Sequence, residues 1–330
     1  MRRLNVRRLP WPTDWAELFG AERPLVLEIG FGQGHFLLHL ARRRPDANLV
    51  GLEISNRCLS RVERAVERQG LRQVRLIHSM AETALQFLFT TASIDEVHVN
   101  FPDPWFRMRH RHRRLMQRQT LDLLVNRLRP GAGFTLATDI RAYAEMSHAL
   151  LAATPGLDNL LDAPWVGSLP GRVVTRYERV AREEGRRCYF MVWRRNGRPP
   201  PAAPRAKELP MPHVLLRSPL SLAAMRARFE PQQWHSGATH VSCSRVFLGE
   251  RSLLFDVYVK EPNIDQHLAL LLLERRNRPG EFTLQPAMYG HPRATEGLHL
   301  ATNALADWLL ALDEGAALLG RKTGAAEPDG

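Results

Sequence analysis

Short apolar runs alternate with stretches of helical spacing through the first 195 residues. Runs typical of strands lie at 25–29, 49–54, 74–77, 94–99, 134–137 and 188–193. Stretches with apolar positions at helical spacing lie at 36–40, 59–66, 121–128 and 175–184. This alternation predicts an α/β fold built on a doubly wound, mostly parallel sheet, with ligands bound beyond the carboxyl ends of its strands.

The pattern changes after a proline-rich stretch at 197–204, which predicts a semi-rigid linker. Alternating runs at 241–247 and 253–259 predict a hairpin, and a further strand and a closing helix are expected at 267–274 and 299–312. We therefore expect a small α+β domain behind the α/β domain. The expected organisation is a basic arm at 1–19, the α/β domain at 20–196, a linker at 197–210, the small domain at 211–318 and a flexible tail at 319–330.

Charge is distributed unevenly between these parts. The formal net charge is +12, with 32 Lys and Arg against 20 Asp and Glu in residues 1–204, but 14 against 14 in residues 205–330. An excess of this size indicates a polyanionic partner for the first part of the chain. Residues 1–15 carry four arginines before the first acid, Asp14, which fits either a basic arm or a solvated terminus.

The sequence also limits the cellular compartments in which we expect the protein. It contains no apolar run near the roughly 18 residues of a membrane span, and its start lacks the apolar centre of a secretory signal. The three cysteines, Cys58, Cys188 and Cys243, are far apart and fit neither a disulfide framework nor a four-cysteine zinc site. We expect a cytoplasmic protein without a membrane partner. The oligomeric state cannot be inferred from the sequence.

Three glycines, Gly30, Gly32 and Gly34, directly follow the first predicted strand. Such a turn lets a ligand approach the backbone closely. A dinucleotide fingerprint would need its third glycine one position later, where His35 stands. The spacing therefore disfavours a nicotinamide dinucleotide.

Two carboxylates flank this loop. Glu28 lies just before the glycines and can face an amino group, and Glu53 ends the second strand, where its two oxygens can accept hydrogen bonds from ribose hydroxyls. A glycine loop that does not bind a diphosphate can instead accommodate the methionine part of a ligand along its backbone. Together these features predict a site for S-adenosylmethionine.

The fourth predicted strand leads into the stretch 100–105, Asn-Phe-Pro-Asp-Pro-Trp. Its prolines stiffen the loop on both sides of Asp103 and fix the direction of the carboxylate. We interpret this loop as the place of chemistry, because a doubly wound fold brings its substrate there.

A run of one charge sign follows, with no acid between residues 104 and 120. If its first part is extended, alternate arginines point the same way and suit phosphates, while Trp105 and Phe106 can stack on an extruded base. The run contains Arg107, Arg109, His110, Arg111, His112, Arg113, Arg114 and Arg118. We considered His110 with His112, and His235 with His240 and Cys243, as metal ligands, but neither set has a full complement at a usual spacing, so no metal is expected.

With these motifs in place, the chain resembles the bacterial tRNA (guanine-N7-)-methyltransferases, which methylate guanine 46 in the tRNA variable loop. The resemblance covers roughly residues 20–195 and leaves out the domain after Pro204. It rests on four ordered motifs: the stretch 100–105 with the Arg/His run to Leu115, the stretch 27–34, Thr138-Asp139, and Thr175-Arg176-Tyr177-Glu178.

The resemblance implies roles for individual residues. It implies that Glu28, Glu53 and Asp103 contact the cofactor region, with Asp103 the catalytic residue. It further implies substrate contacts by Arg107, Asp139, Thr175 and Glu178, and RNA contacts by the residues from Arg109 to Arg114.

Two positions depart from the family pattern. Met80 stands where the family often has an acid or amide that recognises adenine, which leaves a backbone contact or the nearby Glu82 for that role. Phe106 stands where proline is usual.

Two alternative functions remain open from the residues. One is another RNA or adenine/amino methyltransferase, although enzymes acting on the adenine amine place Asn/Asp-Pro-Pro-aromatic after this strand, and the stretch 100–103 does not match. The other is an RNA-binding protein on a methyltransferase fold without catalysis, against which the intact Glu28, Glu53 and Asp103 argue.

Overall fold

The computed structural model describes residues 3–105, 114–203 and 209–324. The chain divides into two compact units, Met1–Ala206 and Lys207–Gly330, which we call the first and the second unit. The division falls inside the linker expected at 197–210.

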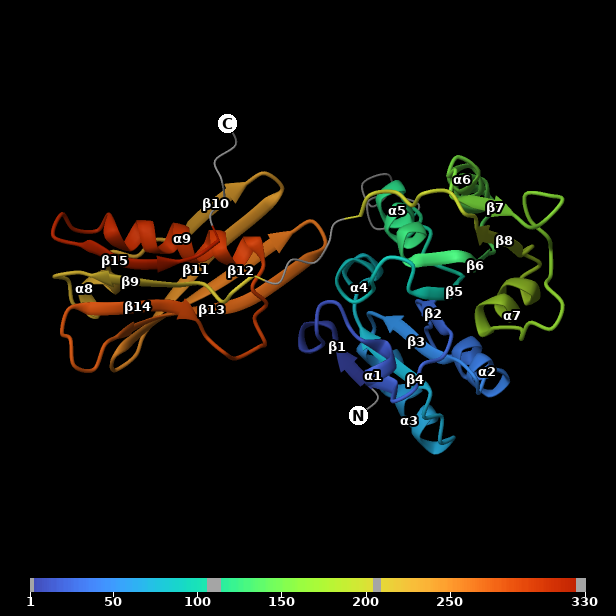
Figure 1. Ribbon diagram of the computed structural model, residues 1–330, viewed down its shortest axis with the longest axis horizontal. Helices are drawn as coiled ribbons and strands as arrows, with labels where there is room; N and C mark the ends of the chain where they lie inside the picture. The colour runs from blue at the N-terminus through green and yellow to red at the C-terminus, as the bar shows by residue number, and fades with distance from the viewer. Residues whose placement is uncertain (1–2, 106–113, 204–208, 325–330) are drawn as a thin grey trace. The chain divides into compact units, whose positions relative to one another are not determined.

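The first unit is built on one eight-stranded sheet with the order β1-β4-β3-β2-β5-β6-β8-β7 (Figure 1). Strands β1 to β6 pair in parallel, and β8 and β7 are added antiparallel beyond β6. The strands are β1 Arg3–Asn5, β2 Leu25–Ile29, β3 Asn48–Glu53, β4 Val74–His78, β5 Ile94–Asn100, β6 Leu128–Thr138, β7 Leu157–Asn159 and β8 Tyr189–Arg195. The expected doubly wound, mostly parallel sheet is confirmed.

Four helices lie at the positions that the apolar spacing predicted, whereas the helices at 15–19, 81–87 and 141–152 were not predicted. In α3, for example, Ser55 caps the first turn by accepting a hydrogen bond from the Cys58 N–H, and Leu59, Val62 and Val66 form the buried stripe. The helices are the short 3-10 helix Val6–Arg8, α1 Trp15–Phe19, α2 His35–Arg43, α3 Asn56–Arg68, α4 Ala81–Phe87, α5 Arg118–Arg127, α6 Arg141–Ala152 and α7 Arg176–Glu183.

The described N-terminal residues are packed onto this unit and do not extend from it as an arm. Strand β1 pairs in parallel with β4 and extends the sheet by one strand. Trp11 is buried and stacks on Phe87, with ring centroids 4.1 Å apart, and Trp15 stacks on Phe89 at 4.9 Å. These two aromatic pairs hold the N-terminal segment on the first unit, because each aromatic side chain removes a large apolar area from water.

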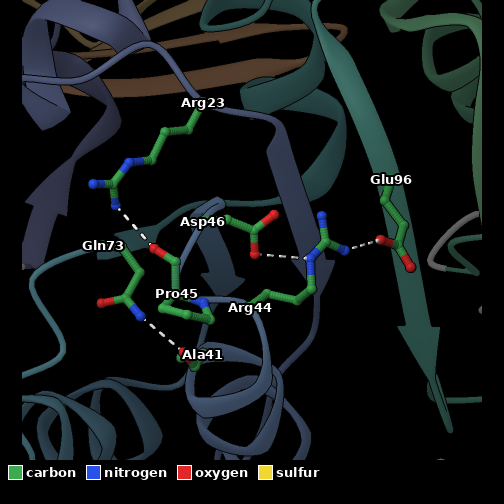
Figure 2. Close-up of polar contacts among 7 residues, drawn as sticks. All are labelled: Arg23, Ala41, Arg44, Pro45, Asp46, Gln73 and Glu96. Atoms are coloured by element: carbon green, nitrogen blue, oxygen red, sulfur yellow. Dashed lines mark hydrogen bonds and ion pairs between the residues drawn. The ribbon is translucent and has the colours of Figure 1, made fainter.

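The end of α2 that lies away from the glycine loop is fixed by a polar network (Figure 2). Arg44 pairs with Asp46 at 3.3 Å and with Glu96 of β5 at 3.2 Å. Gln73, which directly precedes β4, donates to the carbonyl of Ala41 at 2.8 Å. Strand β5 and the loop before β4 therefore both hold this helix end. A helix that is fixed at its C-terminal end presents its N-terminal end in a defined direction.

The second unit is a seven-stranded antiparallel sheet with the order β10-β11-β12-β13-β14-β9-β15, packed against helix α9. Its elements are β9 His213–Arg217, α8 Leu222–Ala227, β10 Gln232–Ser236, β11 Thr239–Leu248, β12 Ser252–Glu261, β13 Ile264–Glu274, β14 Glu281–Pro286, α9 Glu296–Leu310 and β15 Ala317–Lys322. Leu298, Leu305 and Leu309 of α9 are fully buried in the core of this unit. The expected small α+β domain is confirmed, including the hairpin of β11 and β12.

One further property follows from the helices. In the part of the chain that the structure describes, none of them is both long and apolar enough to cross a bilayer.

Candidate active site

The glycine loop joins β2 to α2 in a backbone conformation that residues other than glycine rarely adopt. Gly30, Gly32 and Gly34 have φ values of +73°, +51° and +76°. A Cβ atom on Gly34 would also lie 2.6 Å from the Val62 side chain of α3. Glycine at this position is therefore required twice, by the turn and by the packing of α2 against α3.

Glu28, near the end of β2, is a buried carboxylate with only 1% of its surface exposed. Its Oε1 accepts a hydrogen bond from Asn100 Nδ2 at 2.9 Å, whereas its Oε2 is buried and has no partner of normal hydrogen-bond geometry among the described residues. Burial raises the pKa of Glu28 from 4.5 to about 7; the Asn100 hydrogen bond, Arg172 and the backbone N–H of Leu37 oppose the rise, and Glu53 reinforces it. A buried polar atom without a partner marks a place for a ligand donor.

Glu53, the last residue of β3, holds the glycine loop from the other side. Its Oε2 accepts from the Gly32 N–H at 2.9 Å, and its Oε1 accepts from the backbone N–H groups of Ile54 and Ser55 at 2.8 and 2.9 Å. These bonds fix the direction of the carboxylate. Oε2 keeps a free lone pair for a further donor, because a carboxylate oxygen can accept two hydrogen bonds.

A pocket lies where three segments that are distant in sequence come together. Two residues predicted for the cofactor, Glu28 and Gly30, and one predicted for the substrate, Thr175, line it jointly. The other lining residues are Phe31, Gln33, His35, Phe36, Asn100, Phe101, Arg176 and Tyr177. Asn100 and Tyr177 were not among the predicted site residues, although both lie inside motifs that the sequence singled out.

The loop after β5 is strained on both sides of Asp103. Phe101 and Trp105 have φ values of +52° and +41°, which are unfavourable for aromatic side chains. The Phe101 N–H is nevertheless held by the carbonyl of Ala137 in β6 at 2.8 Å. Such strain persists only where the surroundings enforce it, and it is concentrated at functional sites. Asp103 is exposed and does not itself line the pocket, whereas Asn100 and Phe101 of the same loop do.

Arg114, predicted to contact RNA, lies behind this loop. Its Nε donates to the carbonyl of Pro104 at 3.0 Å and its Nη2 to that of Trp105 at 3.3 Å. The guanidinium therefore ties down the chain directly after Asp103. The other residues of the predicted phosphate-binding run, Arg107, Arg109, His110, Arg111, His112 and Arg113, lie outside the described residues, as does Phe106.

Thr175 and Glu178 form a capping box at the start of α7. The Thr175 side chain accepts from the Glu178 N–H at 3.2 Å, and the Glu178 carboxylate accepts from the Thr175 N–H at 3.4 Å. Glu178 is buried and also pairs with Arg182. Of the predicted substrate residues, Thr175 thus lines the pocket, while Glu178 and Asp139, which pairs with Arg186, are bound to neighbouring side chains.

The position expected to recognise adenine carries an exposed apolar side chain. Met80 precedes α4 and has 59% of its surface exposed. Glu82, the alternative, accepts a hydrogen bond from the Thr120 hydroxyl of α5 at 3.1 Å. The backbone around residue 80 is therefore the better placed of the two contacts weighed from the sequence.

Three arginines act on His35, one of the residues that line the pocket. Burial lowers the pKa of His35, and the positive charges of Arg61, Arg179 and Arg176 lower it further. All three arginines are exposed, and no ion pair to them is found in the described ranges. We call Arg61, Arg176 and Arg179 the positive rim, because Arg176 lines the pocket and all three act on His35 of its lining.

Metal ligation finds no support in the described part of the chain. No group of three or more His, Cys, Asp or Glu side chains there could hold an ion. His235 and His240 do face each other across β10 and β11, with their Nδ1 atoms 2.6 Å apart.

The chain is similar to several known methyltransferases. A family model described as "Putative methyltransferase" matches residues 22–191. The tRNA (guanine-N(7)-)-methyltransferase of Paraburkholderia xenovorans is 38% identical over 195 residues, which cover 59% of this chain and 75% of that protein. Among solved structures, the 16S rRNA methyltransferase KamB has a TM-score of 0.44 and 17% identity, covering 59% of this chain and 100% of that one.

A longer match corrects the extent expected for the resemblance. The tRNA (guanine-N(7)-)-methyltransferase of Thermus thermophilus is 32% identical over 299 residues, which cover 91% of this chain and 93% of that protein. The match is longer than the first unit, which ends at Ala206. Similarity to this relative therefore includes residues of the second unit, which the short motifs of the first unit could not reveal.

Proposed function

Because the chain belongs to the tRNA (guanine-N(7)-)-methyltransferase family, we propose that it transfers a methyl group from S-adenosylmethionine to N7 of a guanine in tRNA, the guanine at position 46 of the variable loop. The observation that carries this proposal is the pocket in which Glu28 and Gly30 meet Thr175 beside the loop of Asp103. Cofactor and substrate residues from separate motifs thus share one site.

The residues present fit S-adenosylmethionine. The unpartnered Oε2 of Glu28 is suited to an ammonium group, and the glycine loop leaves room for the methionyl chain to pass the backbone. Glu53 keeps acceptor capacity for a ribose hydroxyl, as described above. When bound, the cofactor supplies an electrophilic methyl group on a sulfonium centre.

Catalysis of this reaction requires alignment of the reacting groups more than proton transfer. Guanine N7 carries a free lone pair and no proton, so no general base is needed to create the nucleophile. Holding the base in line with the methyl group reduces the entropic part of the barrier. A carboxylate near the ring favours the positive charge that the purine gains, and Asp103 on its strained loop is the group that we assign to this role.

The positive rim supports RNA as the substrate. Arg61, Arg176 and Arg179 are exposed, act on His35 of the pocket lining and suit phosphate oxygens. The run from Arg107 to Arg114 adds further positive charge directly after the Asp103 loop in sequence. A bound tRNA would therefore meet basic side chains from several segments near the reacting base.

The test is to incubate the protein with unmodified tRNA and methyl-labelled cofactor and to map the modified nucleoside. We expect 7-methylguanosine in the variable loop, and we expect Asp103→Ala to retain its fold while losing activity by about two to four orders of magnitude. Label on another base or position would favour a different RNA methyltransferase. Binding of tRNA without cofactor binding or methylation would favour the non-catalytic RNA-binding protein.

A further inference from the structure

A line of two partly buried hydrogen bonds runs from Arg172 to Glu28. Arg172 lies in the segment before α7, and its Nη2 donates to Asn100 Oδ1 at 2.5 Å. Asn100, at the end of β5, donates through its Nδ2 to Glu28 Oε1 at 2.9 Å. Because one end of the Asn100 amide receives from Arg172, the other end must present its N–H group to Glu28.

The guanidinium of Arg172 is held in place by aromatic rings as well. Its Cζ lies 4.8 Å from the ring centroid of Phe36 in α2 and 4.9 Å from that of Phe190 in β8. Two of its nitrogens, Nε and Nη1, are buried without a hydrogen-bond partner in the described residues. Burying two guanidinium nitrogens without hydrogen-bond partners is costly for stability, and this cost points to a role at the site.

No other cation among the groups that act on Glu28 offsets its burial. The charged groups that act on Glu28 are Arg172, which favours the carboxylate, and Glu53, which opposes it. The groups that act on Arg172 are Glu178 of α7, Glu28 itself and Cys188. The positive charge of Arg172 therefore bears directly on whether Glu28 is ionised.

We infer that Arg172 is a positioning residue for the methionyl end of the cofactor: it orients Asn100 and, through it, keeps Glu28 as an ionised carboxylate whose free oxygen receives the ligand ammonium. This inference rests on the proposed function and deepens it. It makes binding of the amino-acid part of the ligand, and not of its adenosine part, depend on a residue that the motifs did not single out.

The test compares two ligands by calorimetric titration between pH 6 and 8.5. S-adenosylhomocysteine carries the amino-acid part, and 5′-methylthioadenosine lacks it. For the wild type we expect the affinity for S-adenosylhomocysteine to rise with pH until Glu28 is ionised, and the affinity for 5′-methylthioadenosine to stay nearly constant.

In Arg172→Met, whose unbranched side chain can lie between the rings of Phe36 and Phe190, the rise should move upward by about one pH unit. At pH 7 the ionised fraction of Glu28 then falls from about one half to about one eleventh, which corresponds to an affinity for S-adenosylhomocysteine lowered about fivefold, with that for 5′-methylthioadenosine changed less than about twofold. Arg172→Lys keeps a cation and should restore part of the shift. Asn100→Ala interrupts the same line from its middle and should reproduce the shift if Arg172→Met does not fold.

The matched control is Arg187→Met, which removes an exposed arginine from the segment that leads into β8 and should leave both ligands and the pH profile unchanged. Equal losses for both ligands in Arg172→Met, or an unshifted profile, would overturn the inference. Normal ligand binding by a wild type that does not methylate tRNA would contradict the proposed function alone. A wild type that binds neither ligand would overturn both.

Discussion

The ionisation of Glu28 carries a cost in the ligand-free protein. Its pKa is raised from 4.5 to about 7, chiefly by burial. Below pH 4.5 the carboxyl is protonated both in the folded and in the unfolded chain, so it does not affect stability through its charge. Between pH 4.5 and 7 the folded protein binds more protons than the unfolded chain, so stability is lost as the pH rises through this window.

We therefore predict that Glu28→Gln stabilises the ligand-free protein at high pH. The free energy of unfolding of the variant, relative to wild type, should increase by about 3 kcal/mol between pH 4.5 and 8, because each unit of pKa shift corresponds to about 1.4 kcal/mol. Urea unfolding at both pH values measures this difference. Glu67→Gln on the exposed side of α3 is the control and should run parallel to wild type, and a parallel course for Glu28→Gln would contradict the assignment.

At the scale of elements, the conformation of the Asp103 loop depends on Arg114. Arg114 donates from two nitrogens to the carbonyls of Pro104 and Trp105, a fork that the single ammonium of lysine cannot reproduce. Arg114→Lys keeps the charge and loses this geometry. We predict that kcat falls about 10- to 100-fold, since small misplacements of a reacting group have effects of this size, while KM for tRNA changes little.

The same variant separates the two roles considered for Arg114. If Arg114 contacts a phosphate of the RNA, lysine should largely preserve that contact. Any weakening of the contact would appear in KM for tRNA and in the salt dependence of binding. Arg194→Lys in β8 is the matched control, because Arg194 is exposed. A raised KM with unchanged kcat in Arg114→Lys would return this residue to the RNA-contacting set.

Elements with a local signal could be predicted from the sequence, and those stabilised from a distance could not. Strand β2 has the predicted bounds, 25–29, because its apolar run is followed at once by the glycine turn. Strand β1 was missed because Arg3–Asn5 has no apolar alternation and gains its place by pairing with β4. Strand β15 is mostly exposed and lies at the edge of its sheet, so its sequence carries little burial pattern.

The site divides in the same way. Glu28 and Asp103 could be proposed from the sequence because each adjoins a motif with its own backbone signature. The link from Arg172 to Asn100 could not, since it joins positions 72 apart in a segment without periodicity. Side-chain contacts of this kind depend on the tertiary fold, which the order of apolar residues specifies only coarsely.

At the scale of the whole molecule, the two units have separate cores and different charge. The second unit buries its own cluster around α9, and residues 205–330 carry as many acidic as basic residues. The pocket and its positive rim are formed entirely by residues of the first unit. The adenosylmethionine site should therefore not need the second unit for its geometry.

We predict that a chain ending at residue 204 keeps its affinity for S-adenosylhomocysteine within about twofold and binds tRNA no more than about tenfold more weakly. The slope of log affinity against log salt should stay the same, because a neutral unit neutralises few phosphates on balance. Circular dichroism establishes that the truncated chain is folded before titration. A folded truncation that loses the homocysteine ligand would show that the second unit supports the cofactor site, and a shallower salt slope would show that it binds phosphates despite its neutral charge.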